Sequence, residues 1–224
     1  MDIKPGMPIF NSADPPKKDG EIALGSIGGF FTGKDNVQYL LTCYHCVYQA
    51  TEGHDEFKPG VTKDRVSTFD PEGHPVEFGT IIYGQINHEV DAALVEVDSN
   101  FNIIPEIPVF QRKPGNIRLE NTYGSLLPVQ KYGLTTEYRK GTFQTISTTQ
   151  GCPYPPNLLI HHFDKLLVID GDGGLFADGG DSGSLILDMG GSVLGMVVLI
   201  DDDLITYGIP VSQLKKNLTQ ISWI

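Results

Sequence analysis

The chain has 224 residues, of which 40% are hydrophobic and 20% are charged, a globular composition that excludes wholesale disorder. Its 16 basic residues against 28 acidic ones give a net charge of −12, which disfavours nucleic-acid and anionic-membrane partners. No apolar run approaches the ~20 residues needed to span a bilayer.

Short apolar or alternating segments bounded by Gly, Asp or Asn predict β-strands along most of the chain. In chain order they are residues 22–24, 29–32, 38–42, 76–82, 92–97, 129–132, 141–147, 157–162, 166–169, 183–187 and 192–199. Residues 99–124 mix proline, asparagine and charge and are expected to connect two lobes. Residues 211–223 carry apolar side chains at helical spacing after a candidate N-cap, Ser212, and predict one C-terminal helix. Strands followed by a single late helix favour barrels or a sandwich over a parallel α/β sheet.

The cysteine content indicates free thiols. Three cysteines, Cys43, Cys46 and Cys152, cannot form a complete set of intramolecular disulfides. The first two have the C-x-x-C spacing of a redox or half-zinc motif, but a zinc site needs about four ligands and there is no second cysteine pair. The first residues also lack the pattern of a secretory signal, so either the protein is cytoplasmic, which we expect, or its signal lies outside this sequence. We expect no metal or organic cofactor.

Three short segments combine residue types that carry nucleophilic chemistry. His45 follows an apolar strand, Asp91 opens another, and Ser182 lies in a glycine-flanked turn before a third. A serine hydroxyl is a poor nucleophile without an adjacent base, and imidazole titrates near neutrality. A buried carboxylate fixes the imidazole tautomer. We therefore expect Ser182 as nucleophile, His45 as base and acid, and Asp91 as the residue that orients His45.

The sequence resembles the chymotrypsin-like (trypsin-fold) serine proteases, and it is closer to bacterial-type and intracellular trypsin-like peptidases than to secreted digestive enzymes. The segments that carry the resemblance are Thr42-Cys43-Tyr44-His45-Cys46, Asp91-Ala92-Ala93-Leu94 and Gly180-Asp181-Ser182-Gly183. The resemblance extends from about residue 20 to the C-terminus. It implies an all-β fold of two six-stranded antiparallel β-barrels with a C-terminal helix. Residues 1–20 are then an N-terminal extension, 21–112 the first lobe with His and Asp, and 113–224 the second lobe with Ser and the helix.

The resemblance also implies an oxyanion hole formed by the N–H groups of Gly180 and Ser182. In many relatives a new N-terminal amine forms an ion pair with the aspartate before the nucleophile. No cleavage site lies at the proper distance before His45, so Asp181 is expected to have another partner, either backbone amides or a Lys or Arg of the N-terminal segment. Alternatively, a protein partner or a cleavage activates a latent chain. Secreted relatives pair the cysteine after the histidine with one where this chain has Ile27, so Cys46 is expected to be a free thiol.

The sequence gives a less clear indication of which substrate side chains the protein would prefer. The residue six positions before the nucleophile is Asp in trypsins and Phe176 here, which does not support a simple trypsin pocket. We take Phe176, Asp178, Val198 and Ile200 as candidate substrate-binding residues. The acidic residues near them attract a basic substrate or form a solvated rim, and we favour the rim. His161 and His162 precede the nucleophile turn, and we favour packed or surface histidines over a pocket for an acidic side chain.

These observations predict a serine endopeptidase that cleaves protein or peptide substrates through an acyl-enzyme. The alternative is a catalytically silent binding or scaffold module with the same fold. A third interpretation keeps the triad but limits it to self-cleavage or to a single protein partner.

Overall fold

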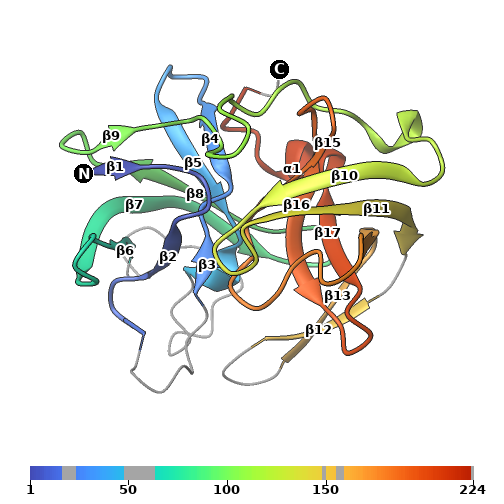
Figure 1. Ribbon diagram of the computed structural model, residues 1–224. Helices are drawn as coiled ribbons and strands as arrows, with labels where there is room; N and C mark the ends of the chain where they lie inside the picture. The colour runs from blue at the N-terminus through green and yellow to red at the C-terminus, as the bar shows by residue number, and fades with distance from the viewer. Residues whose placement is uncertain (17–23, 48–63, 148–149, 155–158, 223–224) are drawn as a thin grey trace.

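The computed structural model describes residues 1–16, 24–47, 64–147, 150–154 and 159–222, with only the backbone described for 150–154 and 159–161. The chain folds into two β lobes that lie side by side (Figure 1). Among the described residues, no helix has the length and apolar character required to cross a membrane.

The first lobe is a seven-stranded antiparallel sheet in the order β3-β2-β6-β7-β8-β5-β4. Its strands are β2 (Pro8–Asn11), β3 (Gly25–Ser26), β4 (Gly29–Thr32), β5 (Gln38–Thr42), β6 (Arg65–Phe69), β7 (Pro75–Ile86) and β8 (Asp91–Val97). The two edge strands, β3 and β4, are joined by only two residues, so the two edges approach each other and the sheet curls. The first of the two expected barrels is therefore an incomplete one.

The second lobe is a closed six-stranded barrel in the order β10-β11-β14-β17-β16-β15. Its strands are β10 (Leu127–Tyr132), β11 (Tyr138–Ser147), β14 (Leu166–Gly171), β15 (Leu185–Asp188), β16 (Val193–Ile200) and β17 (Thr206–Pro210). Closure leaves the barrel without free edges.

Smaller elements complete the architecture. The strands β1 (Asp2–Ile3) and β9 (Asn102–Ile103) pair in parallel, and β12 (Gln150–Tyr154) and β13 (Leu159–Phe163) form a separate hairpin. The short helices are η1 (Tyr44–Cys46), η2 (Glu120–Thr122) and α1 (Val211–Asn217). The N-terminal segment expected as an extension contributes β1 and β2, so part of it lies within the first lobe's sheet.

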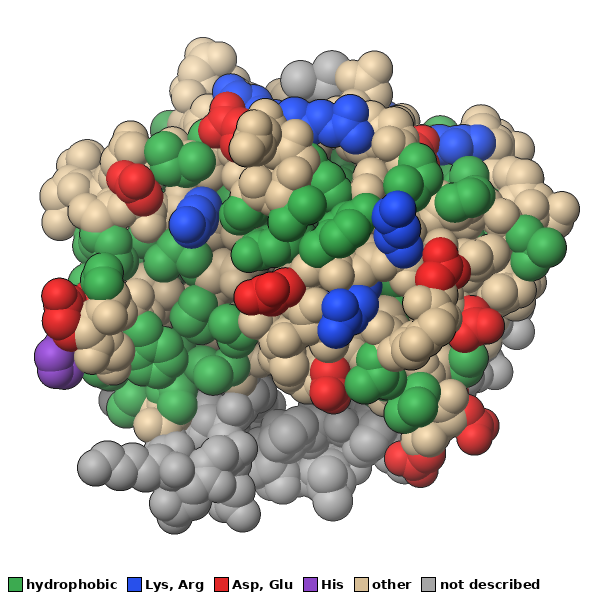
Figure 2. Space-filling view, in the orientation of Figure 1, with side chains coloured by type: hydrophobic (Ala, Val, Ile, Leu, Met, Phe, Trp, Pro, Cys, Tyr) green, Lys and Arg blue, Asp and Glu red, His purple; other side chains and the backbone are tan. Residues whose placement is uncertain are grey.

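The hydrophobic core joins the lobes. One cluster of buried side chains extends from β5 and β8 of the first lobe to β15, β16 and α1 of the second, and another fills the second barrel. Leu40 and Leu94 are fully buried in the first lobe, as are Met196 and Leu214 in the second. The face drawn in Figure 2 carries both basic and acidic side chains around a central group of hydrophobic ones.

The predicted helix is shorter than expected. It begins at Val211 after Pro210 and ends at Asn217, and Ser212 is not its N-cap. The hydroxyl of Ser212 instead donates to the carboxylate of Glu120. Leu218 and Ile221 are nonetheless buried. These two side chains therefore anchor the C-terminal segment to the core, although the helix does not continue through them.

Candidate active site

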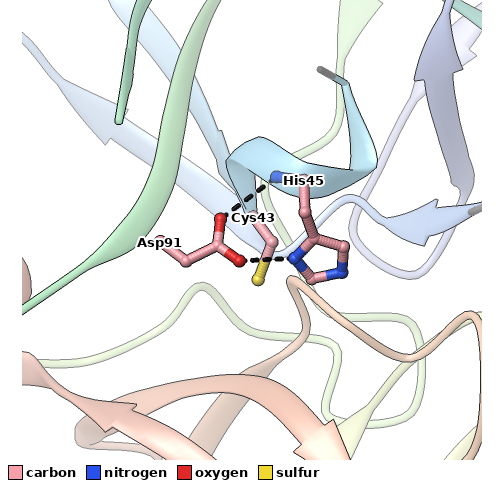
Figure 3. A group of neighbouring side chains, drawn as sticks. All are labelled: Cys43, His45 and Asp91. Atoms are coloured by element: carbon pink, nitrogen blue, oxygen red, sulfur yellow. Dashed lines mark hydrogen bonds and ion pairs between the residues drawn. The ribbon is translucent and has the colours of Figure 1, made fainter. Parts of the chain in front are cut away.

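His45 and Asp91 form a hydrogen-bonded pair at the end of the first lobe. Strand β5 ends at Thr42, and the 3₁₀ turn η1 then places His45 beside Asp91, the first residue of β8. Nδ1 of His45 lies 2.5 Å from Oδ2 of Asp91 (Figure 3). The other carboxylate oxygen accepts the backbone N–H groups of Tyr44 at 2.7 Å and His45 at 3.1 Å. The fully buried carboxylate therefore fixes both the turn and the imidazole ring.

The surroundings of His45 favour its charged form. Burial lowers the pKa of His45, but the negative charges of Cys46 and Asp91 and the hydrogen bonds that they accept outweigh burial and raise it well above 6.5. Burial raises the pKa of the Cys46 thiol. The neighbouring Cys43 thiol and the charge of His45 outweigh burial and lower that pKa to about 6. Burial first, and the neighbouring thiol second, raise the pKa of Cys43 well above 9.0.

Ser182 lies where two tight turns overlap. The N–H of Asp181 donates to the carbonyl of Asp178, and the N–H of Ser184 donates to the carbonyl of Asp181. The third position of each turn is a glycine with positive φ, Gly180 at +97° and Gly183 at +96°. Such turns need glycine at this position, because other side chains rarely adopt that conformation. Ser182 therefore occupies the second position of the second turn, with Gly180 two residues before it and Gly183 directly after it.

Two backbone N–H groups of this segment are available to a ligand. The N–H groups of Asp181 and Gly183 donate to Asp178 and Val197. Among the described residues, the N–H groups of Gly180 and Ser182 have no acceptor. Free donors on either side of Asp181, next to a serine hydroxyl, are what an oxyanion hole requires.

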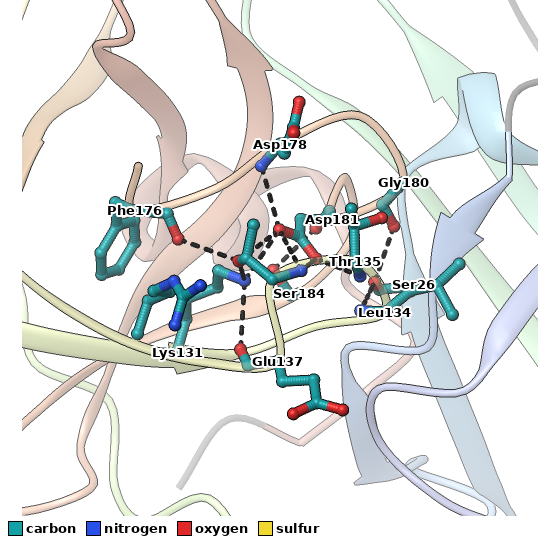
Figure 4. A network of polar contacts seen from close by, with 12 residues as sticks. Ser26, Lys131, Leu134, Thr135, Glu137, Phe176, Asp178, Gly180, Asp181 and Ser184 are labelled. Atoms are coloured by element: carbon teal, nitrogen blue, oxygen red, sulfur yellow. Dashed lines mark hydrogen bonds and ion pairs between the residues drawn. The ribbon is translucent and has the colours of Figure 1, made fainter. Parts of the chain in front are cut away.

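Asp181 is held by a buried lysine that the sequence interpretation missed. Nζ of Lys131, on β10, lies 2.9 Å from Oδ2 of Asp181, and both side chains are fully buried (Figure 4). The carboxylate also accepts the N–H of Thr135 at 2.8 Å, the hydroxyl of Thr136 at 2.7 Å and the N–H of Asp178 at 3.0 Å. The expected backbone amides are thus present, but the cation comes from the second barrel instead of the N-terminal segment.

Burial disfavours the charge on both partners of this pair. For Asp181, the charge and hydrogen bond of Lys131 and the hydrogen bonds from the threonines outweigh burial and lower its pKa below 3.8. For Lys131, burial outweighs the attraction of Asp181 and lowers its pKa below 10.5. Lys131 sits at an inward position of β10, two residues after the fully buried Val129. Alternate residues of a strand face the same side, so the spacing of Lys131 from Val129 could have indicated a buried lysine that needs an acidic partner.

Residues of the first lobe support the nucleophile turn. Ser26 donates its N–H to the carbonyl of Ser182 at 2.7 Å and its hydroxyl to the carbonyl of Gly180 at 2.8 Å. Its own carbonyl accepts the hydroxyl of Thr42 at 2.9 Å. A Cβ atom on Gly28 would lie 2.2 Å from the carbonyl oxygen of Gly183, so only glycine allows this approach of the two lobes.

His45 and Ser182 line an open cleft of about 540 Å³. Its described lining residues are Leu24, His45, Leu175, Asp178, Gly179, Gly180, Ser182, Val198, Leu199, Ile200, Asp201, Asp202 and Leu204. His45 and Ser182 thus share one cleft, together with three of the four candidate substrate-binding residues. The fourth, Phe176, is fully buried in the second barrel, and Leu175 lines the cleft in its place. His162 is exposed, and the side chain of His161 lies outside the described part of the chain.

The hydroxyl of Ser182 donates to the carbonyl of Val198 at 3.4 Å. That distance is long for a hydrogen bond between oxygens, so little opposes rotation of the hydroxyl. Val198 lies at a bulge of β16, where the pairing with β17 shifts between Val197 and Leu199. Bulges of this kind redirect backbone and side-chain groups next to active sites.

The sequence matches no protein-family profile and no curated protein. Solved structures do resemble the fold. Protease A of Thermobifida fusca is 20% identical over 100% of both chains, with a TM-score of 0.65. A Nocardiopsis protease is 18% identical over 98% of this chain and 97% of the other, with a TM-score of 0.61. A glutamic acid-specific serine protease, described as using a histidine triad in substrate binding, is 15% identical over 98% and 100%, with a TM-score of 0.65. These neighbours are chymotrypsin-like serine proteases of the bacterial type, and the likeness confirms the expected chymotrypsin fold.

Proposed function

We propose that the protein is a serine endopeptidase with His45, Asp91 and Ser182 as its catalytic triad. The observation that carries the proposal is one cleft that holds an aspartate-bound histidine, a serine, and two N–H groups without acceptors in the described structure. The fold, which is that of known serine proteases, supports the same chemistry. Fold alone would not, because folds host unrelated functions.

Each group has a chemical role in acyl transfer. With Nδ1 bound to Asp91, Nε2 of His45 takes the Ser182 proton while Oγ attacks the scissile carbonyl carbon. The carbonyl oxygen becomes an oxyanion that accepts the N–H groups of Gly180 and Ser182. His45 then gives its proton to the leaving amine, and the acyl-enzyme remains. Water, deprotonated by His45, then attacks the ester carbon. His45 returns that proton to Oγ of Ser182 as the acyl C–O bond breaks, and the acid product leaves.

We further propose that the chain needs no proteolytic activation. The Lys131–Asp181 ion pair supplies from within the second barrel the charge that a new N-terminal amine supplies in many relatives. The test is fluorophosphonate labelling before and after limited proteolysis. We expect equal labelling rates, and a large increase after cleavage would show that the chain is latent.

The cleft favours substrates with basic or neutral side chains over acidic ones. Among its described lining residues, the only ionisable groups besides His45 are Asp178, Asp201 and Asp202. Three carboxylates repel a glutamate side chain and attract lysine or arginine. The glutamate preference of one structural neighbour is therefore not proposed for this chain.

Fluorophosphonate labelling followed by intact mass tests the proposed chemistry. We expect one adduct on the wild type, none on Ser182→Ala, and one on Ser99→Ala, which removes an exposed serine in the turn after β8. A folded wild type without an adduct would favour the silent binding module. An adduct that persists in Ser182→Ala would place the nucleophile elsewhere.

A further inference from the structure

Two thiols flank the proposed catalytic histidine, and the function proposed above uses neither. Cys43 and Cys46 stand at either end of the turn that carries His45, and both are free and buried. The N–H of Cys46 donates to the carbonyl of Cys43 at 3.3 Å, which brings the two residues together across one turn. Each thiol also shifts the pKa of the other. This C-x-x-C segment is therefore a paired dithiol.

The dithiol contacts residues of both lobes at the proposed site. Sγ of Cys43, a ring nitrogen of His45 and a carboxylate oxygen of Asp91 all lie within 4.8 Å of one another (Figure 3). Cys43 donates to the carbonyl of Val197 at 3.2 Å, and Cys46 donates to the carbonyl of Ser182 at 3.8 Å. The thiols thus bind the histidine turn to the nucleophile turn of the other lobe.

We propose that Cys43 and Cys46 form a thiol modification site, at which a peroxide oxidises the pair to a disulfide and thereby switches off the peptidase. The effect on activity rests on the proposed function, whereas formation of the disulfide does not. The two residues bracket a single 3₁₀ turn, and disulfides join residues whose Cα atoms lie about 4.4–6.8 Å apart.

The chemistry balances with hydrogen peroxide as the oxidant. The Cys46 thiolate attacks one peroxide oxygen, the O–O bond breaks, and a sulfenic acid forms while hydroxide takes up a proton as water. The Cys43 sulfur then attacks the sulfenic sulfur, forms the S–S bond and releases a second water. Two thiols lose two electrons and two protons, and peroxide is reduced to two waters. The lowered pKa of Cys46 and the raised pKa of Cys43 fit their roles as attacking and resolving thiols.

Disulfide formation changes the site through the histidine turn. The two sulfurs must approach to about 2 Å to form the bond, which tightens the turn between them. That turn donates the N–H groups of Tyr44 and His45 to Asp91, so its movement displaces the His45–Asp91 pair. The carbonyl of Val197 also loses the S–H donor of Cys43. A displacement of about 1 Å at reacting groups costs about 10²-fold in rate.

The test uses the full chain with Cys152→Ser, so that Cys43 and Cys46 are the only thiols. After graded hydrogen peroxide, denatured samples are alkylated with N-ethylmaleimide and weighed, and the crosslink is mapped by peptide mass. We expect a fall from two adducts to none, with a mass loss of about 2 Da. Fluorophosphonate labelling should fall about 10²-fold in parallel and return with dithiothreitol. In Cys43→Ser the crosslink should be absent, and oxidation should stop at an oxygen adduct of Cys46.

The outcomes separate this proposal from the proposed function. Oxidation that adds oxygen to Cys46 without a crosslink overturns the disulfide, whether or not the protein labels. A crosslinked protein that labels as fast as the reduced one overturns the switch. If the reduced protein does not label at all, the peptidase proposal fails, and the mass measurement still decides whether the disulfide forms.

Discussion

Replacement of Lys131 by methionine tests the most consequential contact that was found only in the structure. Methionine fills a similar volume without the charge, so Asp181 stays buried without a cation. Removal of one partner of a buried ion pair costs about 3–5 kcal/mol, because the other charge is left without compensation. Asp181 keeps its hydrogen bonds from Thr135, Thr136 and Asp178, which places the expected loss near the lower end of that range.

The same substitution should also slow the reaction of Ser182. Asp181 lies between the two residues whose N–H groups form the proposed oxyanion hole, so its displacement misaligns both donors. Loss of a single such donor costs about 10²–10³ in rate. We therefore expect fluorophosphonate labelling of Lys131→Met to slow at least about 10²-fold. A loss of about 3 kcal/mol should lower the unfolding temperature by about 6–12 °C, since a chain of this size shifts by about 2–4 °C per kcal/mol.

Two controls isolate the ion pair. Lys140→Met makes the same substitution at an exposed position of β11, opposite Gln130 of β10, and should change neither measurement. The double variant Lys131→Met, Asp181→Asn removes both charges and should unfold at a higher temperature than Lys131→Met alone. If Lys131→Met keeps the wild-type unfolding temperature and labelling rate, the ion pair does not hold the nucleophile turn.

Three further predictions concern the triad and the turn. Asp91→Asn should keep the fold and slow labelling about 10⁴-fold, because the wrong imidazole tautomer faces Ser182; a loss below tenfold would contradict the role of Asp91. Gly180→Ala places a Cβ atom 2.4 Å from Thr135 Oγ1 at a residue whose φ is +97°. The resulting strain of about 1–3 kcal/mol should also slow labelling. In the control Gly179→Ala, the new Cβ atom meets open space and should leave labelling unchanged. Labelling should rise with pH through a midpoint above 6.5, because neutral His45 is the proposed base and its pKa is raised. Cys46→Ser removes a charge that raises this pKa and should move the midpoint to lower pH. The stabilisation that charged His45 provides is complete below pH 6.5 and disappears as pH rises through the raised pKa; an unmoved midpoint in Cys46→Ser would show that the thiolate does not act on His45.

The sequence was sufficient for the features that local patterns encode. Strands β4 and β5 have the predicted bounds, 29–32 and 38–42, because apolar alternation ends there at turn residues. His45, Asp91 and Ser182 each stand within a short segment whose neighbours determine the local turn or strand. For Ser182, the glycines at positions 180 and 183 specify the two turns directly.

Features that depend on distant pairing were not predictable in this way. Lys131 and Asp181 are separated by 50 positions, so only the barrel closure of β10 against β15 brings them together. Strand β6 begins with Arg65 and strand β2 with Pro8, and neither presents a clear apolar pattern without its sheet neighbours. The position of Phe176 was inferred from a residue count in trypsins, but its side chain is buried in the second barrel and Leu175 lines the cleft instead.

The contacts between the lobes are also the contacts that assemble the site. Ser26, on a strand of the first lobe, binds the carbonyls of Ser182 and Gly180 in the second. The histidine turn reaches the same second-lobe segment through Cys46, and Gly28 allows the close approach of Gly183. Neither lobe alone contains the proposed base, the proposed nucleophile and the two N–H donors. The docking of the lobes therefore determines the geometry of the site, and a change that loosens the docking affects labelling before it unfolds either lobe.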